Sequence, residues 1–196
     1  ENQTTTLGGI AAVQALIEIV VPYPGKYIEA DFDIKDINEG ENSFFELNID
    51  NLGTEDIFLS SRIDIHGENG EKIYTKDLPS QNIKSKESIQ LGDSIESSDF
   101  KAGIYSVDAV LNYGKELKMN DSFRVGHFLV EILDYSYIFE SGKINPFSIS
   151  IENSWNSKMQ NVYSEVSVTD KGKVIDSFKT PSVNLEPWEI TNLTGY

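Results

Sequence analysis

The chain has 196 residues, with 32 acidic and 16 basic side chains, a formal net charge of −16 and no cysteine. This length suffices for one large domain or two of ordinary size, and a hydrophobic share of 39% supplies enough apolar side chains for buried cores. The acidic balance repels the phosphates of nucleic acid and the anionic face of a membrane, so nucleic acid is not an expected partner. The lack of cysteine excludes disulfides, thiolate metal sites and cysteine nucleophiles.

An apolar segment follows the polar residues 1–6. Residues 7–21 carry one charge, Glu18, and the uncharged run 7–17 is shorter than the roughly 20 residues that span a bilayer, so no membrane span is predicted. Residues 16–21 are rich in β-branched side chains and lead into Pro22-Tyr23-Pro24-Gly25, which predicts a strand entering a turn. Residues 7–15 fit a helix or a strand.

Short strands are predicted along the rest of the chain. The clearest covers 45–51, where Phe45, Leu47 and Ile49 share one face and polar residues share the other. Further strands are predicted at 27–34, around Ile63 and Ile65, and at 73–75, 88–91, 104–113 and 117–125. The intervening turns lie at 38–42, 51–53, 67–70 and 114–115, with a crossing loop at 78–80. Seven or so strands at this spacing are typical of an immunoglobulin-like sandwich.

The second half of the chain repeats part of the first. Nine residues recur after a constant 102 positions: Gly40, Phe45, Asn51, Gly70, Pro79, Ser80, Asn82, Glu87 and Leu91 match Gly142, Phe147, Asn153, Gly172, Pro181, Ser182, Asn184, Glu189 and Leu193. We therefore expect an all-β protein of two tandem sandwiches, 22–126 and 127–196, preceded by an N-terminal extension, 1–21. The junction near Gly126-His127 has almost no linker, so the two should sit end to end with restricted bending.

The repeat is incomplete. A counterpart of the closing hairpin 103–125 would lie beyond Tyr196, so the second sandwich is expected to lack its C-terminal hairpin and to have an open apolar groove with an unpaired sheet edge. Three explanations remain open: the chain is a fragment of a longer single-chain adhesin, the second sandwich closes differently, or a neighbouring molecule donates a strand. Donation head to tail would propagate as a filament.

The apolar N-terminal segment is the candidate donor for such an assembly. Its large apolar side chains form the predicted assembly segment: Leu7, Ile10, Val13, Leu16, Ile17, Ile19 and Val21.

Several short motifs resemble those of a known group of proteins. They are residues 21–27 (Val-Pro-Tyr-Pro-Gly-Lys-Tyr), 38–41 (Asn-Glu-Gly-Glu), 51–53 (Asn-Leu-Gly) and 103–107 (Gly-Ile-Tyr-Ser-Val). Together they resemble the immunoglobulin-like repeats of archaeal cell-surface proteins, which include CARDB-type adhesion modules. The resemblance covers 22–126 well and 128–196 in part. It implies the fold and an extracellular or cell-surface location, and it supplies no catalytic residues.

Candidate ligand-binding groups are few. Asp31, Asp33 and Asp36 are spaced closely enough to offer oxygen ligands to calcium, although alternate carboxylates also suit the solvated face of a strand. Tyr135, Tyr137, Trp155 and Tyr163 suit either a sugar platform or packing within a sandwich. Sequons predict glycosylation at Asn2, Asn120 and Asn192 if the protein is exported.

The motifs favour a structural role over catalysis. His66 and His127 have no nearby nucleophile or metal-ligand pattern, and no phosphate-binding glycine loop is present. We predict a non-enzymatic structural or adhesive subunit of an extracellular assembly or filament, without a cofactor, that associates with itself or with another surface protein. The alternative is a glycan- or calcium-binding surface module.

Overall fold

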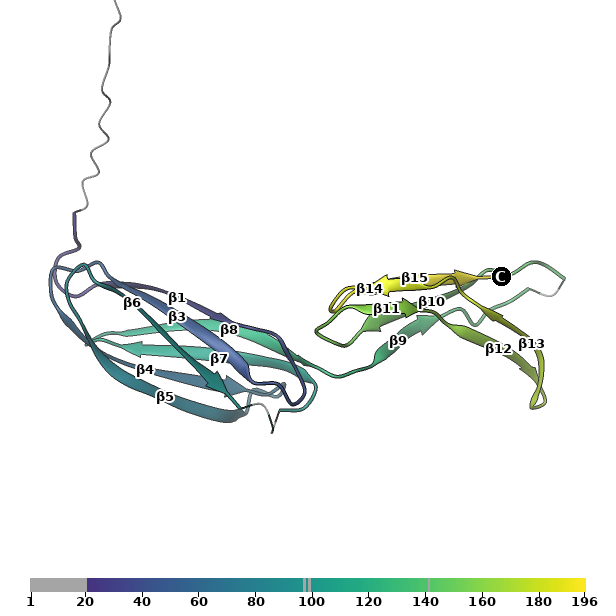
Figure 1. The fold of residues 1–196 in the computed structure, drawn as a ribbon, viewed down its shortest axis with the longest axis horizontal. Coiled ribbons are helices and arrows are strands. Elements are labelled where there is room, and N and C mark those ends of the chain that lie inside the picture. The colour runs from purple at the N-terminus through teal and green to yellow at the C-terminus, as the bar shows by residue number, and fades with distance from the viewer. Residues whose placement is uncertain (1–20, 97, 99, 141) are drawn as a thin grey trace, which may run out of the picture.

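The computed structural model describes residues 21–196 except 97, 99 and 141. The helices and strands assigned to these residues are all β-strands. Figure 1 shows two β-rich units that follow one another along the long axis of the molecule. The strands of the first are β1 (Ile28–Ile34), β2 (Ile37–Asn38), β3 (Ser43–Asn51), β4 (Ile57–His66), β5 (Lys72–Ile83), β6 (Ser88–Ile95), β7 (Gly103–Asn112) and β8 (Glu116–Gly126). Those of the second are β9 (Val130–Tyr135), β10 (Phe147–Asn153), β11 (Met159–Val162), β12 (Glu165–Asp170), β13 (Lys173–Lys179), β14 (Val183–Leu185) and β15 (Ile190–Gly195).

The first unit is a sandwich of two sheets. One sheet has the order β1-β3-β6 and the other the order β2-β8-β7-β4-β5. All neighbours are antiparallel except β2 and β8, which pair in parallel through Ile37 with Val125 and Asn38 with Gly126. The division of the strands between two sheets is that of an immunoglobulin-like domain, in which the short early strand β2 pairs with the last strand β8. The all-β prediction is confirmed.

Strand β3 shows why this sequence forms a sandwich. Its burial alternates without exception from Ser43 to Asn51, and Phe45, Leu47 and Ile49 are each at most 1% exposed. An extended strand places every second side chain on the same face. The alternation of apolar and polar residues therefore favours a sheet with one buried face. Strands β7 and β8 complete the opposite layer with the buried residues Val107, Ala109, Leu111, Phe123 and Val125.

The second unit has fewer strands and a smaller core. Its largest sheet has the order β15-β10-β9, and the remaining strands form two separate pairs, β11-β14 and β12-β13. Figure 1 shows β12 and β13 as a hairpin that projects from the rest of the sandwich. Among the described residues, six buried hydrophobic side chains form its core, against twenty in the first unit. As expected from the repeat, the described residues 127–196 include no counterpart of the hairpin formed by β7 and β8.

The offset of 102 residues also relates individual hydrogen bonds. Asn51 donates from Nδ2 to the carbonyl oxygens of residues 55, 83 and 84, and Asn153 donates to those of residues 157, 185 and 186. Both asparagines are fully buried. The amide therefore binds three equivalent carbonyl oxygens in each unit, which explains why asparagine stands at both positions.

Two details of the chain differ from the sequence-based expectations. Residues 78–80 do not form a crossing loop, because β5 runs through them to Ile83. Pro79 fits there because β5 lies at the edge of its sheet, where one missing N–H donor need not break the sheet. The two-residue strand β2 was not predicted, since two residues are too few to show any alternation.

Candidate functional site: an open groove in the second sandwich

One edge of the second sandwich has no strand beside it. In the first sandwich, β4 lies between β5 and β7. In the second, β11 pairs only with β14, and β12 pairs only with β13, among residues 21–196 as described. The backbone N–H and C=O groups along the other edge of β11 and β12 thus lack a ladder partner, at the place where the first sandwich has its closing hairpin.

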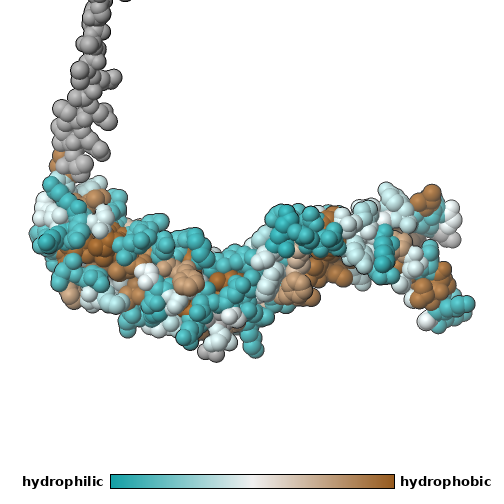
Figure 2. Space-filling model, in the orientation of Figure 1, coloured by the Kyte–Doolittle hydropathy of each residue, from teal (hydrophilic) through white to brown (hydrophobic). Residues whose placement is uncertain are grey.

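An apolar groove lies beside β11 and residues 163–164, which lead into β12. It consists of two hollows of about 510 Å³ and about 340 Å³ that share Val130 and Val162. The first is lined by Phe128, Leu129, Trp155 and Met159 among others, and the second by Ile132, Ile149, Ile151, Tyr163 and Leu193 among others. Figure 2 shows apolar surface along the underside of the second sandwich. The groove therefore exposes side chains that a complete sandwich would cover.

The exposure of large apolar residues is concentrated in this unit. Fifteen of the twenty-one large hydrophobic residues that are exposed in the described chain lie from Phe128 onward. Ile132 on β9 is 60% exposed and Tyr163 is 49% exposed. Large exposed apolar patches mark interaction sites on proteins, because exposing apolar surface to water costs free energy.

A β-bulge before β12 turns Val166 toward the small core of the second sandwich. Asn161 has a left-handed backbone with φ of 57°, and the pairing of β11 with β14 shifts register between Met159 and Val162. In the first sandwich Ile63 and Ile65 of β4 are buried, and the 102-residue offset would put Glu165 and Ser167 at their places. The bulge shifts the strand by one residue, so that Val166 pairs with Phe178 instead. The constant offset inferred from the sequence thus breaks by one residue here, and the break places Val166 against the small core.

The junction between the sandwiches is a network of direct bonds. The Asp36 carboxylate accepts hydrogen bonds from the Arg124 backbone N–H at 2.7 Å and from the Trp188 indole N–H at 2.9 Å. The Arg124 guanidinium lies 4.1 Å from the centre of the Trp188 ring and donates to the Glu152 carboxylate at 2.9 Å. Each of these contacts except the Arg124 backbone bond crosses from one sandwich to the other, so they hold the two units end to end.

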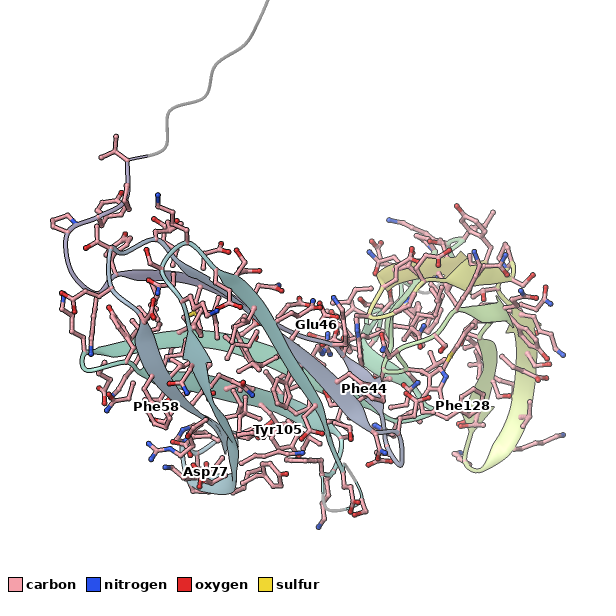
Figure 3. The ribbon with its side chains drawn as sticks, turned by 60° about the vertical axis from the view of Figure 1, so that its left-hand side comes forward. Phe44, Glu46, Phe58, Asp77, Tyr105 and Phe128 are labelled. Carbon is pink, nitrogen blue, oxygen red and sulfur yellow. The ribbon has the colours of Figure 1, made fainter. Side chains whose placement is uncertain are left out.

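Backbone contacts reinforce this junction. Asn156 donates from its N–H to Asn38 Oδ1 at 2.8 Å and from Nδ2 to the Asp36 carbonyl oxygen at 2.7 Å. A Cβ atom on Gly126 would lie 2.5 Å from the Trp188 ring and 2.7 Å from the Ser154 carbonyl oxygen. Glycine is thus required where the chain passes between the sandwiches. In Figure 3, Phe128 lies on the second sandwich beside this junction.

The residues proposed for calcium do not gather into one site. Asp36 belongs to the junction, Asp33 forms an ion pair with Lys35, and Asp31 is an exposed residue of β1. No group of three or more His, Asp or Glu side chains that could hold a metal ion occurs within the described part of the chain. Calcium binding stays a prediction from the sequence.

The other predicted sites are scattered. Asn120 and Asn192 are exposed strand residues, while Asn2 and the assembly segment up to Ile19 lie outside the described residues. Val21, the last member of that segment, is 79% exposed. Of the four proposed platform aromatics, Trp155 packs against Phe128 and Tyr163 lies under the Lys179 ammonium group, so they serve separate contacts.

A larger hollow lies on the first sandwich. Its volume is about 650 Å³, and it is formed by the β4–β5 turn, the loop after β6 and the start of β7. Tyr74, Phe100 and Tyr105 provide aromatic walls and Glu68 and Glu71 line the rim. Burial and the nearby carboxylates of Glu68 and Glu71 raise the pKa of Tyr105. The sequence did not indicate this hollow, because its residues come from three separate segments.

Comparison with known proteins gives similarities of shape alone. No family model matches the chain, and no curated protein sequence matches it. A red sea bream transglutaminase structure aligns with a TM-score of 0.45 at 9% identity over 86% of this chain, which spans 26% of that protein. The C-terminal domain of Wzt aligns with a TM-score of 0.41 at 12% identity, over 51% of this chain and 77% of that one.

A CARDB domain is among these similar structures. The CARDB domain of a Pyrococcus furiosus protein, solved in complex with di-metal ions, aligns with a TM-score of 0.39 at 15% identity, over 53% of this chain and 92% of that domain. Likenesses at this level define neither a family nor an activity. The class of protein follows from the sheets themselves, which are those of tandem immunoglobulin-like sandwiches.

The described residues also bear on membrane insertion. From residue 21 onward, outside positions 97, 99 and 141, the structure has no helix with the length and apolar character needed to cross a bilayer.

Proposed function

We propose that this protein is a non-enzymatic structural or adhesive subunit of an extracellular surface assembly, and that the groove of its second sandwich binds a β-strand from another molecule. The observation that carries the proposal is the free edge of β11 and β12, with an apolar groove beside β11. An added strand supplies hydrogen bonds to the unpaired backbone groups and apolar side chains to the hollows. The same two contributions come from β7 in the first sandwich.

The strand we assign to the groove is the apolar segment 7–21 of a second copy. Figure 1 places the start of the described chain, Val21, at the end of the first sandwich that is remote from the second. The described chain therefore begins at the end of the first sandwich that is remote from the groove-bearing second sandwich (Figure 1), and a head-to-tail contact between two copies leaves a free donor and a free acceptor at each step. The product is an open chain of subunits, and the contacts across the junction keep each subunit elongated.

The proposal is tested by deleting residues 1–21 and by placing a charge on the face of β12 that carries Val166 in the full chain. Val168 lies on the same strand face as Val166, and it is 42% exposed. We expect Val168→Lys to reduce the mass of the assemblies measured by sedimentation to that of single chains, as the deletion does. Ser167→Lys, on the opposite face of β12, is the matched control and should assemble as the wild type does. Assembly that is unchanged in either the deletion variant or the Val168→Lys chain would contradict the proposal.

A second candidate function is glycan binding by the first sandwich. The 650 Å³ hollow combines aromatic walls with polar side chains, which is the composition of many sugar sites. On this reading, a glycan array probed with the full chain gives signals that Tyr74→Ala removes. Signals that survive Tyr74→Ala, or none at all, would contradict it.

A further inference from the structure

The segment assigned to the groove is similar in sequence to one strand of the first sandwich. Residues 10–19 read Ile-Ala-Ala-Val-Gln-Ala-Leu-Ile-Glu-Ile, and residues 104–113, which are β7 and the residue after it, read Ile-Tyr-Ser-Val-Asp-Ala-Val-Leu-Asn-Tyr. The isoleucine, valine and alanine at the first, fourth and sixth positions are identical. Polar residues stand at the fifth and ninth positions of both, and large apolar residues at the seventh, eighth and tenth.

Strand β7 has no counterpart among the described residues 127–196. In the first sandwich it pairs with β4 over residues 106–112, and its inward residues Val107, Ala109 and Leu111 are fully buried. We infer that residues 10–19 imitate β7 when they bind the groove of a second copy. The binding has one phase, meaning that a fixed set of side chains faces inward, and one register, meaning that each residue has a fixed partner on β12. This inference rests on the proposed function and specifies how its donor strand binds.

The phase follows from the position of the polar residues. Placed as β7 is, the segment directs Val13, Ala15 and Ile17 inward, where β7 has Val107, Ala109 and Leu111. Gln14 and Glu18 then point outward, where the exposed or half-buried Asp108 and Asn112 lie. The opposite phase would bury both polar side chains. Ile10 and Leu16 face outward in this arrangement, as Ile104 and Val110 do in β7.

The register follows from the bulge at Asn161. Phe178 stands 102 residues after Lys76, and its partner on β12 is Val166, whereas the partner of Lys76 on β4 is Ile63. Val166 thus takes the place of Ile63, and Ser167 takes that of Asp64. Ile63 pairs with Ala109 and Asp64 with Asp108 in the first sandwich. The donated strand therefore runs antiparallel to β12 with Ala15 opposite Val166 and Gln14 opposite Ser167.

The small residue at the sixth position fits this register. Ala109 is fully buried between β4 and β8 and faces the core of the first sandwich. A long charged side chain at the equivalent Ala15 would point toward the apolar core against which Val166 packs, whereas the same side chain at Gln14 would reach solvent. The two adjacent positions consequently differ sharply in what they tolerate, which makes them a matched pair for a test.

The first experiment compares Ala15→Lys with Gln14→Lys in the full chain. We expect Ala15→Lys to remove assembly, and Gln14→Lys to assemble with an affinity within about three-fold of the wild type. Circular dichroism verifies that both chains are folded. A synthetic peptide of residues 7–21 with the natural sequence should bind the free groove of the Ala15→Lys chain. Equal assembly of both variants, or loss only with Gln14→Lys, would overturn the assigned phase.

The second experiment tests the register with engineered disulfides, which the absence of natural cysteine makes unambiguous. The chain with Gln14→Cys and Ser167→Cys should form intermolecular disulfides at least ten-fold faster than the chain with Gln14→Cys and Glu165→Cys, since Glu165 lies two residues away on the same face. A faster reaction at Glu165, or none at either position while Val168→Lys still blocks assembly, would overturn the register and leave the groove as the binding site. If the Val168→Lys chain assembles as the wild type does, the proposed function itself is refuted.

Discussion

Single buried polar residues fix the geometry of the first sandwich. Asp64 is 4% exposed and is held by the Lys72 ammonium group at 2.9 Å, the Arg62 guanidinium at 3.1 Å and the Thr75 hydroxyl at 2.7 Å. Burial by itself raises the pKa of this carboxyl, but the hydrogen bonds from Lys72 and Thr75 and the charge of Arg62 outweigh it, so folding lowers the pKa of Asp64. The ionised form of Asp64 therefore stabilises the fold.

Replacing Asp64 should reveal this contribution through its pH dependence. A carboxyl whose pKa is lowered by folding stabilises the protein above its unfolded pKa of about 3.9, and the stabilisation is lost as the pH falls through the folded pKa. We expect Asp64→Asn to lower the free energy of unfolding of the first sandwich by about 1.5–3 kcal/mol at pH 7. The difference from the wild type should shrink at pH 3. Urea unfolding at both pH values measures it, with the exposed Asp50→Asn as control, and a difference that does not depend on pH would contradict the account.

At the scale of elements, strands with one buried face could be predicted and strands without one could not. The alternation in β3 and in β10 predicts both strands, and their burial follows it. Strand β5 extends across Pro79 because its edge position tolerates proline, and that position depends on the strand order of the whole sheet. The sequence does not contain that information locally.

The candidate site was predictable only in outline. The incomplete repeat indicates an open groove, but the side of β12 that faces the small core depends on one bulged residue, Asn161. The position of the junction was predicted, but its contacts were not, because Asp36, Arg124 and Trp188 come from distant segments. A signal was available: Trp188 and Asp36 depart from the repeat, since their counterparts at the 102-residue offset are Lys86 and Ile138.

The bulge itself can be tested by changing the residue that forms it. Asparagine and glycine adopt a left-handed backbone at low cost, whereas a β-branched residue does not. We expect Asn161→Val to destabilise the second sandwich by about 1–3 kcal/mol in thermal unfolding and to weaken assembly, because β12 loses its register. Asn161→Gly should remain close to the wild type in both measurements. Equal stability of the valine and glycine variants would show that the bulge is not required.

At the scale of the whole molecule, the junction determines how the two ends are related. Trp188 contacts both the Asp36 carboxylate and the Arg124 guanidinium of the first sandwich, and it adopts a left-handed backbone with φ of 60°. Lys86, at the corresponding place in the first sandwich, has nearly the same φ of 65°. The backbone turn is therefore shared by the two sandwiches, while the indole side chain is used only at the junction.

Removing the indole should loosen the molecule without unfolding it. We expect Trp188→Ala to broaden the distribution of end-to-end distances in small-angle X-ray scattering, because the cation–π contact and the Asp36 hydrogen bond are lost. Lys86→Ala is the matched control and should leave the scattering curve unchanged. A Trp188→Ala curve that superimposes on that of the wild type would show that other contacts determine the orientation.

Amide hydrogen exchange of the assembled protein tests the central claim most directly, since it reports whether the free edge of β11 and β12 gains a partner strand. We predict that amides within 162–168 exchange slowly in wild-type assemblies and rapidly in the Ala15→Lys chain, while amides of β3 stay equally protected in both. Rapid exchange at 162–168 in wild-type assemblies would contradict strand addition at this edge.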